Sequence, residues 1–427
     1  MGIMIGSGIF LVAGAIALQL DSLLEVMAAW ALGGLLSLCG AVSLSELGAA
    51  FPYAGGLYVY ITEAYGPALG FVYGWSAMAL IHGGSLATLA VAVGLYAAPL
   101  FGLSPLEQKI LQVLCIVAFT AVNCFGVVLG KHVQNTLTIA KLGGLALMTA
   151  MLYWRGNMHL ITANFWPAQR GLHWAAFAVA LIAVLWAYDG WHFVSFAAGE
   201  IKNPTRTLPL SLVIGTTLTL AIYILANLSY YAVLPRQAIR ATDRVAAAAV
   251  EHAFGQGAGA FISVLIAVSI LGAINGIILG APRIQWAMAR DGLFFRSFGS
   301  VHPRYRTPVV ATVAQGGCAV LFSLVGSFQQ LFTSYIFASW IFYGLSVGAV
   351  IVLRKRRPEL PRPYLCPLYP LTPIFFMIAT LGIVIGTFTT SFRQAALGTA
   401  LLLLGLPLYF VFRGLQRLEG SAVQPSS

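Results

Sequence analysis

Long apolar runs separated by short polar segments cover almost the whole chain. A helix needs about 20 apolar residues to cross the hydrocarbon core of a bilayer, and the pattern predicts twelve such helices. Their approximate ranges are 1–20, 24–50, 67–98, 108–129, 133–153, 173–199, 207–234, 257–289, 309–326, 330–353, 371–391 and 395–413. The runs are continuous rather than alternating, which excludes a transmembrane β-barrel. We therefore predict an all-α polytopic membrane protein, with a single transmembrane domain over residues 1–427 that ends in a short tail at 414–427.

The composition agrees with this prediction and excludes other classes of protein. Of the 427 residues, 59% are hydrophobic and only 8% are charged, whereas about 25% of the residues of a soluble domain are charged. The mean hydropathy is +0.88. A water-soluble enzyme, a nucleic-acid-binding protein and a disordered chain are therefore excluded, and the lipid bilayer is the expected environment.

The formal net charge of +11 describes membrane topology, because the lysines and arginines lie in short loops between apolar runs. When the N-terminus is placed in the cytoplasm, the cytoplasmic loops carry about twice as many basic residues as the outer loops. The run Arg354–Arg357 is the strongest single signal. We predict a multi-pass plasma-membrane protein with both termini in the cytoplasm.

Two of the predicted spans contain a break in their apolar pattern. The first reads Gly2-Ile-Met-Ile-Gly-Ser-Gly-Ile-Phe10, and its glycines and serine weaken a helix. The sixth reads Trp186-Ala-Tyr-Asp-Gly-Trp191, which places an acid and a glycine near mid-membrane. Breaks in these positions favour an inverted repeat of five plus five helices, with the substrate held between the two broken helices. The first repeat would cover about 1–153 and the second about 173–353, followed by two extra helices at about 371–413. Glycines that merely allow close helix packing are the alternative.

These motifs resemble those of a known family. The first is similar to the first-helix signature of the amino acid–polyamine–organocation superfamily. The second, with the following Gly199-Glu-Ile-Lys-Asn-Pro-Thr-Arg-Thr-Leu-Pro209, looks like the sixth helix and next loop of its L-type amino acid transporter branch. Further matching patterns are Ala140-Lys-Leu142, Asn227-Leu-Ser-Tyr230 and Asn275-Gly276. The resemblance covers nearly the whole chain and implies a leucine-transporter-like fold and a bacterial-type amino acid transporter.

The resemblance also implies a substrate site at the two breaks. The substrate carboxylate is expected to bind free N–H groups at the positive end of the first helix, approached closely through its glycines. These positions are Gly6, Ser7, Gly8 and Ile9. The ammonium group is expected to bind unpaired carbonyls, those of Met4, Trp186, Ala187 and Asp189. We also place Asn275 in this site.

Three further residues are candidates for coupling or gating. Lys141 lies mid-helix, where its ammonium would replace a coupling cation, and this predicts sodium-independent exchange. The alternative is that the Lys141 side chain snorkels to the cytoplasmic face. By resemblance, Tyr230 joins the Lys141 network, or it belongs to an interfacial aromatic belt. Trp186 stands where the family usually has a phenylalanine gate. It therefore favours small neutral substrates, or it only packs against the tenth helix.

The acidic residues allow two kinds of interpretation. Asp189 either caps the second half of the sixth helix, through the N–H groups from Trp191 to Phe193, or carries a proton. Glu46 is interpreted either as a gate residue at the inward end of its helix or as an acid that packs there. Glu200 is expected to pair with Arg206. The histidines have no partners at metal-ligand spacing, so neither a metal site nor a cofactor is predicted.

The sequence thus predicts a sodium-independent exchanger of small neutral amino acids rather than an enzyme. A proton-coupled permease and a non-transporting amino acid receptor are the alternatives. In animal members of the branch a cysteine between the third and fourth helices joins a glycoprotein subunit. The segment Pro99 to Leu106 has none, so no disulfide-linked heavy subunit is expected. In the family a half-helix and a cytoplasmic tail precede the first glycine of the signature, so a mis-set start or a fragment is expected.

Overall fold

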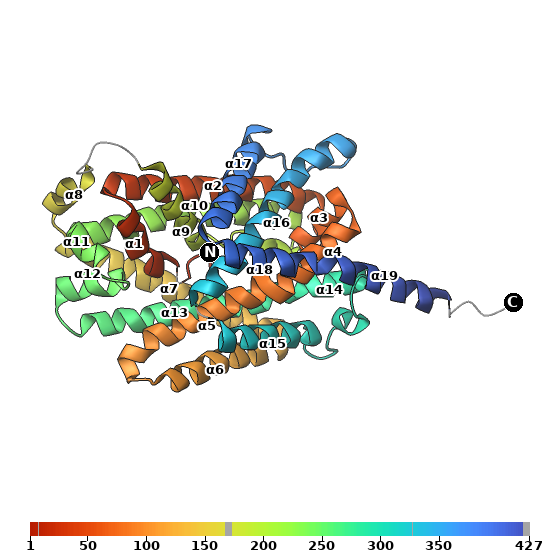
Figure 1. Ribbon diagram of the computed structural model, residues 1–427, viewed down its shortest axis with the longest axis horizontal. Coiled ribbons are helices and arrows are strands. Elements are labelled where there is room, and N and C mark those ends of the chain that lie inside the picture. Colours follow the sequence, from red (N-terminus) through yellow and green to blue (C-terminus); the bar gives the residue numbers. More distant parts are fainter. Residues whose placement is uncertain (7, 167–172, 327, 422–427) are drawn as a thin grey trace.

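The computed structural model describes residues 1–6, 8–166, 173–326 and 328–421, and within these ranges the regular elements are helices (Figure 1). In this part of the chain, 9 helices are long and apolar enough to cross a membrane. They are Leu23–Ala50 (α2), Pro67–Phe101 (α4 and α5), Pro105–Cys124 (α6), Val127–Arg155 (α7), Pro204–Val233 (α10), Ala258–Arg290 (α13 and α14), Gln330–Arg356 (within α16, Phe328–Arg356), Leu371–Thr390 (α17) and Phe392–Gly414 (within α18 and α19). The polytopic all-α prediction is confirmed.

The other three predicted spans correspond to shorter apolar helices. These are α1 (Gly8–Gln19), α9 (Trp174–Ala187) and α15 (Val309–Val325). Two of the three are short because the chain leaves the helix at the breaks seen in the sequence. Residues 2–6 form turns and bends before α1, and residues 188–192 form turns between α9 and a 3-10 helix at Phe193–Glu200. Gly190 has a φ of +102°, which only glycine adopts without strain.

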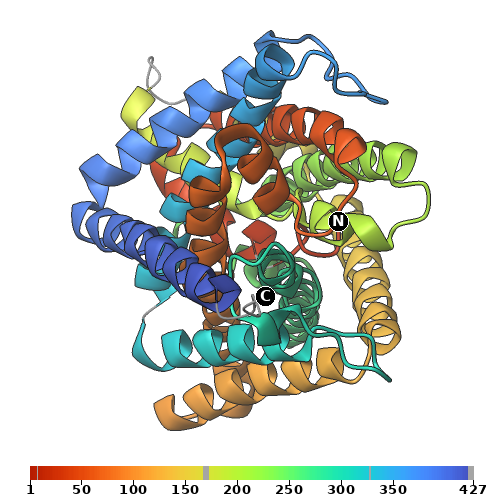
Figure 2. The ribbon, with the colours of Figure 1, turned by 90° about the vertical axis from the view of Figure 1, so that its right-hand side faces the viewer.

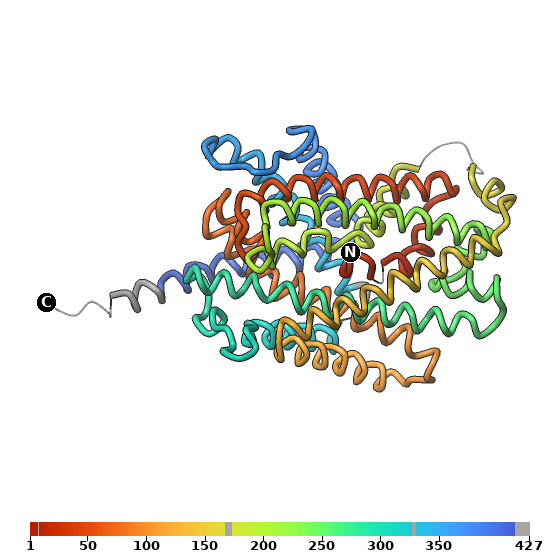
Figure 3. The backbone as a smooth tube through the Cα atoms, turned by 180° about the vertical axis from the view of Figure 1, so that it is seen from behind, coloured from red at the N-terminus to blue at the C-terminus, as the bar shows by residue number. Residues whose placement is uncertain are grey.

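The helices pack in two neighbouring groups. α2 packs against both α10 and α9, and α9 also packs against α1. α13 packs against α5 and α7, while α15 packs against α5 and α6. Figure 3 shows α2 and α10 running side by side along one edge of the molecule, with α6 and α15 along the opposite edge. Seen end-on, the helices surround the start of α1 (Figure 2). The division into two inverted repeats stays a prediction.

Some local features differ from the sequence prediction. Short helices occupy connections that were expected to be loops: α3 (Leu57–Tyr65), α8 (Met158–Phe165), α11 (Arg236–Arg240) and α12 (Val245–Phe254). The sequence pattern did not predict them, because each is too short to form an apolar span. The predicted third span contains a π-helical turn at Ala77–His82 between α4 and α5. The predicted eighth span divides into α13 (Ala258–Gly280) and α14 (Pro282–Arg290), since Pro282 lacks the N–H that a continuous helix needs.

Candidate functional site

A small cavity of about 30 Å³ lies between the two interrupted segments. Its wall combines residues before α1, residues around the end of α9, and side chains from the helices packed beside them. The lining residues are Ile3, Met4, Gly6, Gly8, Ser85, Leu89, Trp186, Ala187, Asp189, Phe193, Ala273, Ile277 and Tyr335. Both sequence breaks therefore meet at one small space inside the helix bundle.

Gly8 is required for the close approach of α1 and α9. A Cβ atom at position 8 would lie 2.5 Å from the Cα atom of Ala187 and 2.7 Å from its Cβ atom. Real side chains do not reach such distances, so a larger residue must push the two segments apart. The neighbouring Ile9 is fully buried but does not line the cavity. Ser7 lies outside the described residues.

Tyr223 of α10 connects the two breaks. Its hydroxyl group lies 2.6 Å from the carbonyl oxygen of Met4 and 2.9 Å from that of Ala187, close enough to hydrogen-bond both. The prediction that these two carbonyls are unpaired is therefore wrong. The carbonyl of Trp186 likewise accepts from the N–H of Asp189 at 2.9 Å. A carbonyl oxygen has two lone pairs. The Met4 carbonyl uses both, because it also accepts from the N–H of Gly6 at 2.8 Å, whereas the Ala187 carbonyl retains capacity for a second donor.

We expect Tyr223→Phe to loosen the pairing of the two breaks. The substitution keeps the ring and leaves two buried carbonyls without this donor, at a cost of about 1–3 kcal/mol. The KM for substrate should rise roughly tenfold, as measured by initial rates of labelled amino acid uptake. Tyr231→Phe is the matched control, because Tyr231 is also a buried tyrosine of α10. Equal KM values for the two variants would contradict the bridging role.

Lys141 of α7 is buried against the first residues of the chain, with 1% of its surface exposed. Its Nζ atom donates to the carbonyl oxygens of Gly2 at 2.7 Å and Ser269 at 2.9 Å. The Ser269 hydroxyl in turn donates toward the carbonyls of Ile5 and Gly6 at 3.2 and 3.3 Å. The ammonium group therefore does not extend to solvent, and it ties the segment before α1 to α7 and α13.

Trp186 closes one side of the cavity against α16. Its indole N–H donates to the hydroxyl of Tyr335, and its ring meets that of Phe332 edge-on with centroids 4.9 Å apart. Tyr335 precedes Arg354 by 19 positions in α16, which is about 28 Å at ~1.5 Å per residue, so this contact lies far from the basic run Arg354–Arg357. The ring both packs against the tenth predicted span and bounds the cavity.

The Asp189 side chain does not cap the N–H groups from Trp191 to Phe193 as expected. One carboxylate oxygen instead accepts from the N–H of Gly190 and the hydroxyl of Tyr343, both at 2.8 Å. The positive φ of Gly190 turns the chain directly after this N–H. Nδ1 of the buried His192 lies 4.0 Å from the same oxygen.

Two residues assigned from sequence lie away from the cavity. Asn275 donates to the Gly130 carbonyl and the Gln134 side chain and accepts from Asn123, so it joins α13 to α6 and α7. Tyr230 is buried, and its hydroxyl has no hydrogen-bond partner among the described residues. It therefore belongs neither to the Lys141 network nor to an exposed aromatic belt.

Glu46 of α2 is 1% exposed and forms the centre of a charged cluster. Arg354 of α16 donates to its two oxygens at 2.9 and 2.6 Å, and Arg362 lies 3.4 Å from one of them. The backbone N–H of Cys366 donates to it at 2.8 Å. Burial raises the pKa of the Cys366 thiol, which is therefore neutral at neutral pH. The cluster fastens α2 to α16 and to the loop before α17.

We expect Glu46→Gln to weaken this attachment. The substitution leaves two arginines without their counter-charge, which costs about 3–5 kcal/mol for a buried pair. The temperature of half-unfolding in detergent should fall by several degrees. Glu359→Gln is the control, since Glu359 is exposed in the same loop. An equal unfolding temperature for both variants would show that the cluster adds no stability.

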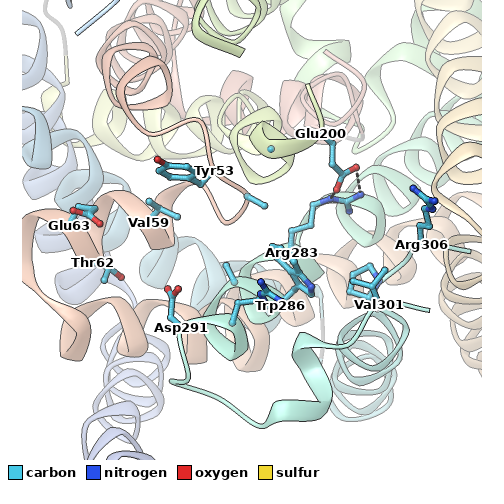
Figure 4. A pocket seen from close by; sticks show the side chains of 15 residues that line it. Tyr53, Val59, Thr62, Glu63, Glu200, Arg283, Trp286, Asp291, Val301 and Arg306 are labelled. Carbon is cyan, nitrogen blue, oxygen red and sulfur yellow. Dashed lines mark hydrogen bonds and ion pairs between the residues drawn. The ribbon is translucent and has the colours of Figure 1, made fainter. Parts of the chain in front are cut away.

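Two larger pockets lie near the cavity and the basic run, since one shares residues with the cavity wall and the other is lined by Glu63, the partner of Arg357. One of about 460 Å³ shares Ile3, Met4 and Phe193 with the cavity wall. The other, of about 550 Å³, is shown in Figure 4. Arg283 and Glu200 line both pockets and form an ion pair of 2.5 Å between them. The predicted pairing of Glu200 with Arg206 is therefore wrong, because Glu200 pairs with Arg283 of α14.

Comparison with known proteins identifies the family. The family described as amino acid permease matches residues 1–412. The chain belongs to the amino acid permease family. It is 33% identical to the serine/threonine exchanger SteT of Bacillus subtilis, over 96% of this chain and 93% of that protein. It is 32% identical to the human b(0,+)-type amino acid transporter 1, over 96% and 85% respectively, and 28% identical to the human cystine/glutamate transporter, over 96% and 83%.

Sequence reasoning missed several residues that shape the site of this permease. Ser85, Tyr335 and Tyr343 come from apolar spans with no motif to mark them. Tyr223 also lies in a helix that reads as ordinary membrane sequence. Their positions depend on which helices pack together, and a single apolar pattern does not reveal this.

Proposed function

We propose that the protein is a sodium-independent exchanger of small neutral amino acids in the plasma membrane, with both termini in the cytoplasm. The observation that carries the proposal is the small cavity that both helix interruptions line. The bulky side chains of Trp186 and Tyr335 in the cavity wall favour a short substrate side chain over a long one. The similarity to a relative named as a serine/threonine exchanger supports the same substrate class and exchange.

The cavity wall offers complementary groups for a zwitterion. The N-terminus of α1 at Gly8 presents backbone N–H groups and a positive dipole end to the substrate carboxylate. The turn after α9 presents carbonyl oxygens to the ammonium group, next to the carboxylate of Asp189. The substrate side chain would then face Trp186, Tyr335 and Ser85. Backbone groups recognise what all amino acids share, and these side chains limit size.

Two further features support the transport cycle that we propose. The Lys141 ammonium supplies a fixed positive charge beside the breaks, which removes the need for a coupling sodium ion. Trp186 and Tyr335 close the outer side, while the pockets behind Glu200 and Arg283 adjoin the inner side. Opening of these two sides in turn would deliver substrate across the membrane. We propose no disulfide-linked partner subunit and no catalytic activity.

The proposal is tested with purified protein in liposomes. Entry of labelled alanine, serine, leucine and arginine is followed in sodium-free buffer at equal pH, with and without internal unlabelled amino acid. We expect entry of alanine and serine that requires internal substrate and does not change when sodium is added. Preference for leucine or arginine would overturn the assignment of substrate size. Binding without flux would identify a receptor.

A proton-coupled permease is the second candidate, because Asp189 lines the cavity beside Tyr343 and His192. A carboxylate that faces both substrate and buried polar partners is the usual form of a proton carrier in a membrane. The same liposomes test it. Uptake that ignores internal amino acid but follows an imposed pH gradient would favour this candidate over exchange.

A further inference from the structure

A membrane-facing groove of about 580 Å³ runs between α16 and α17. Its lining includes Ile341 and Ile351 of α16 and Ile374 and Ile378 of α17, and α17 leaves Ile378 65% exposed. The lining positions of α16 are 341, 344, 345 and 351, and those of α17 are 374, 377, 378, 380, 381 and 384, so each helix contributes one face, or stripe, whose side chains are mostly apolar. The groove is separate from the substrate cavity and shares no lining residue with it.

Close contacts between the two helices fix the direction and length of the groove. A Cβ atom at Gly344 would lie 2.7 Å from Thr380. One at Gly348 would lie 3.0 Å from the hydroxyl of Tyr65, an α3 residue that also lines the groove, and 3.4 Å from Met377. The helices α16 and α17 therefore run antiparallel, with Ile341 level with Val384. The stripe from Ile341 to Ile351 then measures about 15 Å, at about 1.5 Å per residue. The hydrocarbon thickness of one leaflet is also about 15 Å, half of the ~30 Å core. The groove is therefore about as long as the hydrocarbon region of one leaflet is thick.

A free positive charge stands at the end of the groove. Lys355 follows Ile351 by one helical turn and so lies on the same face of α16. In the adjacent basic run, Arg354 pairs with Glu46, Arg356 donates to the Ala64 carbonyl and Arg357 pairs with Glu63. Lys355 is exposed, and its ammonium has no carboxylate partner in the described part of the chain. This cation lies at the depth expected for lipid head groups.

We propose that the groove between α16 and α17 binds one anionic phospholipid, with an acyl chain along the two apolar stripes and the phosphate at Lys355. The apolar lining fits a hydrocarbon chain, the length fits one leaflet, and the unpaired ammonium fits a negative head group. The lipid would lie on the helix that also carries Tyr335 and Tyr343 at the cavity side.

Lipid binding is measured by native mass spectrometry of the purified full-length protein, titrated with phosphatidylglycerol and, separately, phosphatidylcholine. We expect the first phosphatidylglycerol to bind about fivefold more tightly than phosphatidylcholine, which is the usual contribution of one basic residue near anionic lipid. Lys355→Gln should abolish this preference. Lys202→Gln is the control, since Lys202 is an exposed lysine of another loop.

A second variant tests the groove itself. Ile378→Trp places a larger side chain in the groove and should lower the binding of both lipids by roughly threefold or more, because acyl-chain packing is lost. Ile214→Trp is its control, since Ile214 is a 52% exposed residue of α10 outside the groove. Unchanged lipid binding in Ile378→Trp would overturn the proposal. A wild-type dimer that Ile378→Trp dissociates would assign the groove to a second copy of the chain and would overturn it as well.

Discussion

Gly8→Val is expected to weaken amino acid binding about 100-fold in a protein that still folds. The cost comes from backbone atoms, because a Cβ atom at position 8 would lie 2.5 Å from the Cα atom of Ala187. A backbone atom cannot rotate away, so α1 and the end of α9 must separate at the point where both line the cavity. Strain of this kind typically costs about 1–3 kcal/mol. We expect substrate affinity to fall about 100-fold, measured by thermal stabilisation of the purified protein by alanine or serine.

The control separates this contact from a general effect of valine in a membrane helix. Gly143 of α7 has no atom within 4 Å of the position that a Cβ atom would take. Gly143→Val should therefore bind substrate like the wild type. Size-exclusion profiles of both variants test whether each is folded. Wild-type affinity in a folded Gly8→Val protein would show that the substrate does not bind at the start of α1.

The overall architecture could be predicted from sequence because a membrane imposes simple length rules. Each apolar run of about 20 residues became a helix or a pair of helices. The two glycine-containing breaks could also be found, because glycine and an acidic residue within a membrane span conflict with a continuous helix. Gly190, with its positive φ, is the clearest example. Short connecting helices such as α12 were missed, since they do not cross the membrane.

Side-chain roles were harder to predict, because helical phase and distant partners decide them. Asn275 lies only two residues from Ala273 and from Ile277, which line the cavity, but two residues turn about 200° around a helix. The Asn275 side chain therefore faces α6 and α7. Glu200 was paired by proximity in sequence with Arg206, whereas its partner Arg283 is 83 positions away. In α10, Tyr223 rather than Tyr230 reaches the breaks, two turns along the helix.

Lys141→Ala is expected to stop transport while the protein still folds. The Lys141 ammonium is the donor to the Gly2 and Ser269 carbonyls, which hold the segment before α1 against α7 and α13. Loss of one donor to buried acceptors costs about 1–3 kcal/mol. Removal of a buried charge also relieves its desolvation cost, so the helix bundle should persist. We expect the rate of serine exchange in liposomes to fall more than tenfold at an unchanged amount of reconstituted protein.

Arg155→Ala separates the buried ammonium from an ordinary basic residue of the same helix. Arg155 is exposed at the end of α7 and lines neither the cavity nor the two larger pockets, so its loss should leave exchange close to the wild-type rate. Lys141→Arg keeps the charge but not the shape. The Nζ atom donates to the Gly2 and Ser269 carbonyls at 2.7 and 2.9 Å, and the larger, planar guanidinium group does not reproduce this geometry, so exchange should fail again. Normal exchange in Lys141→Ala would restrict this lysine to a structural role and would leave the proposed sodium independence without a physical basis.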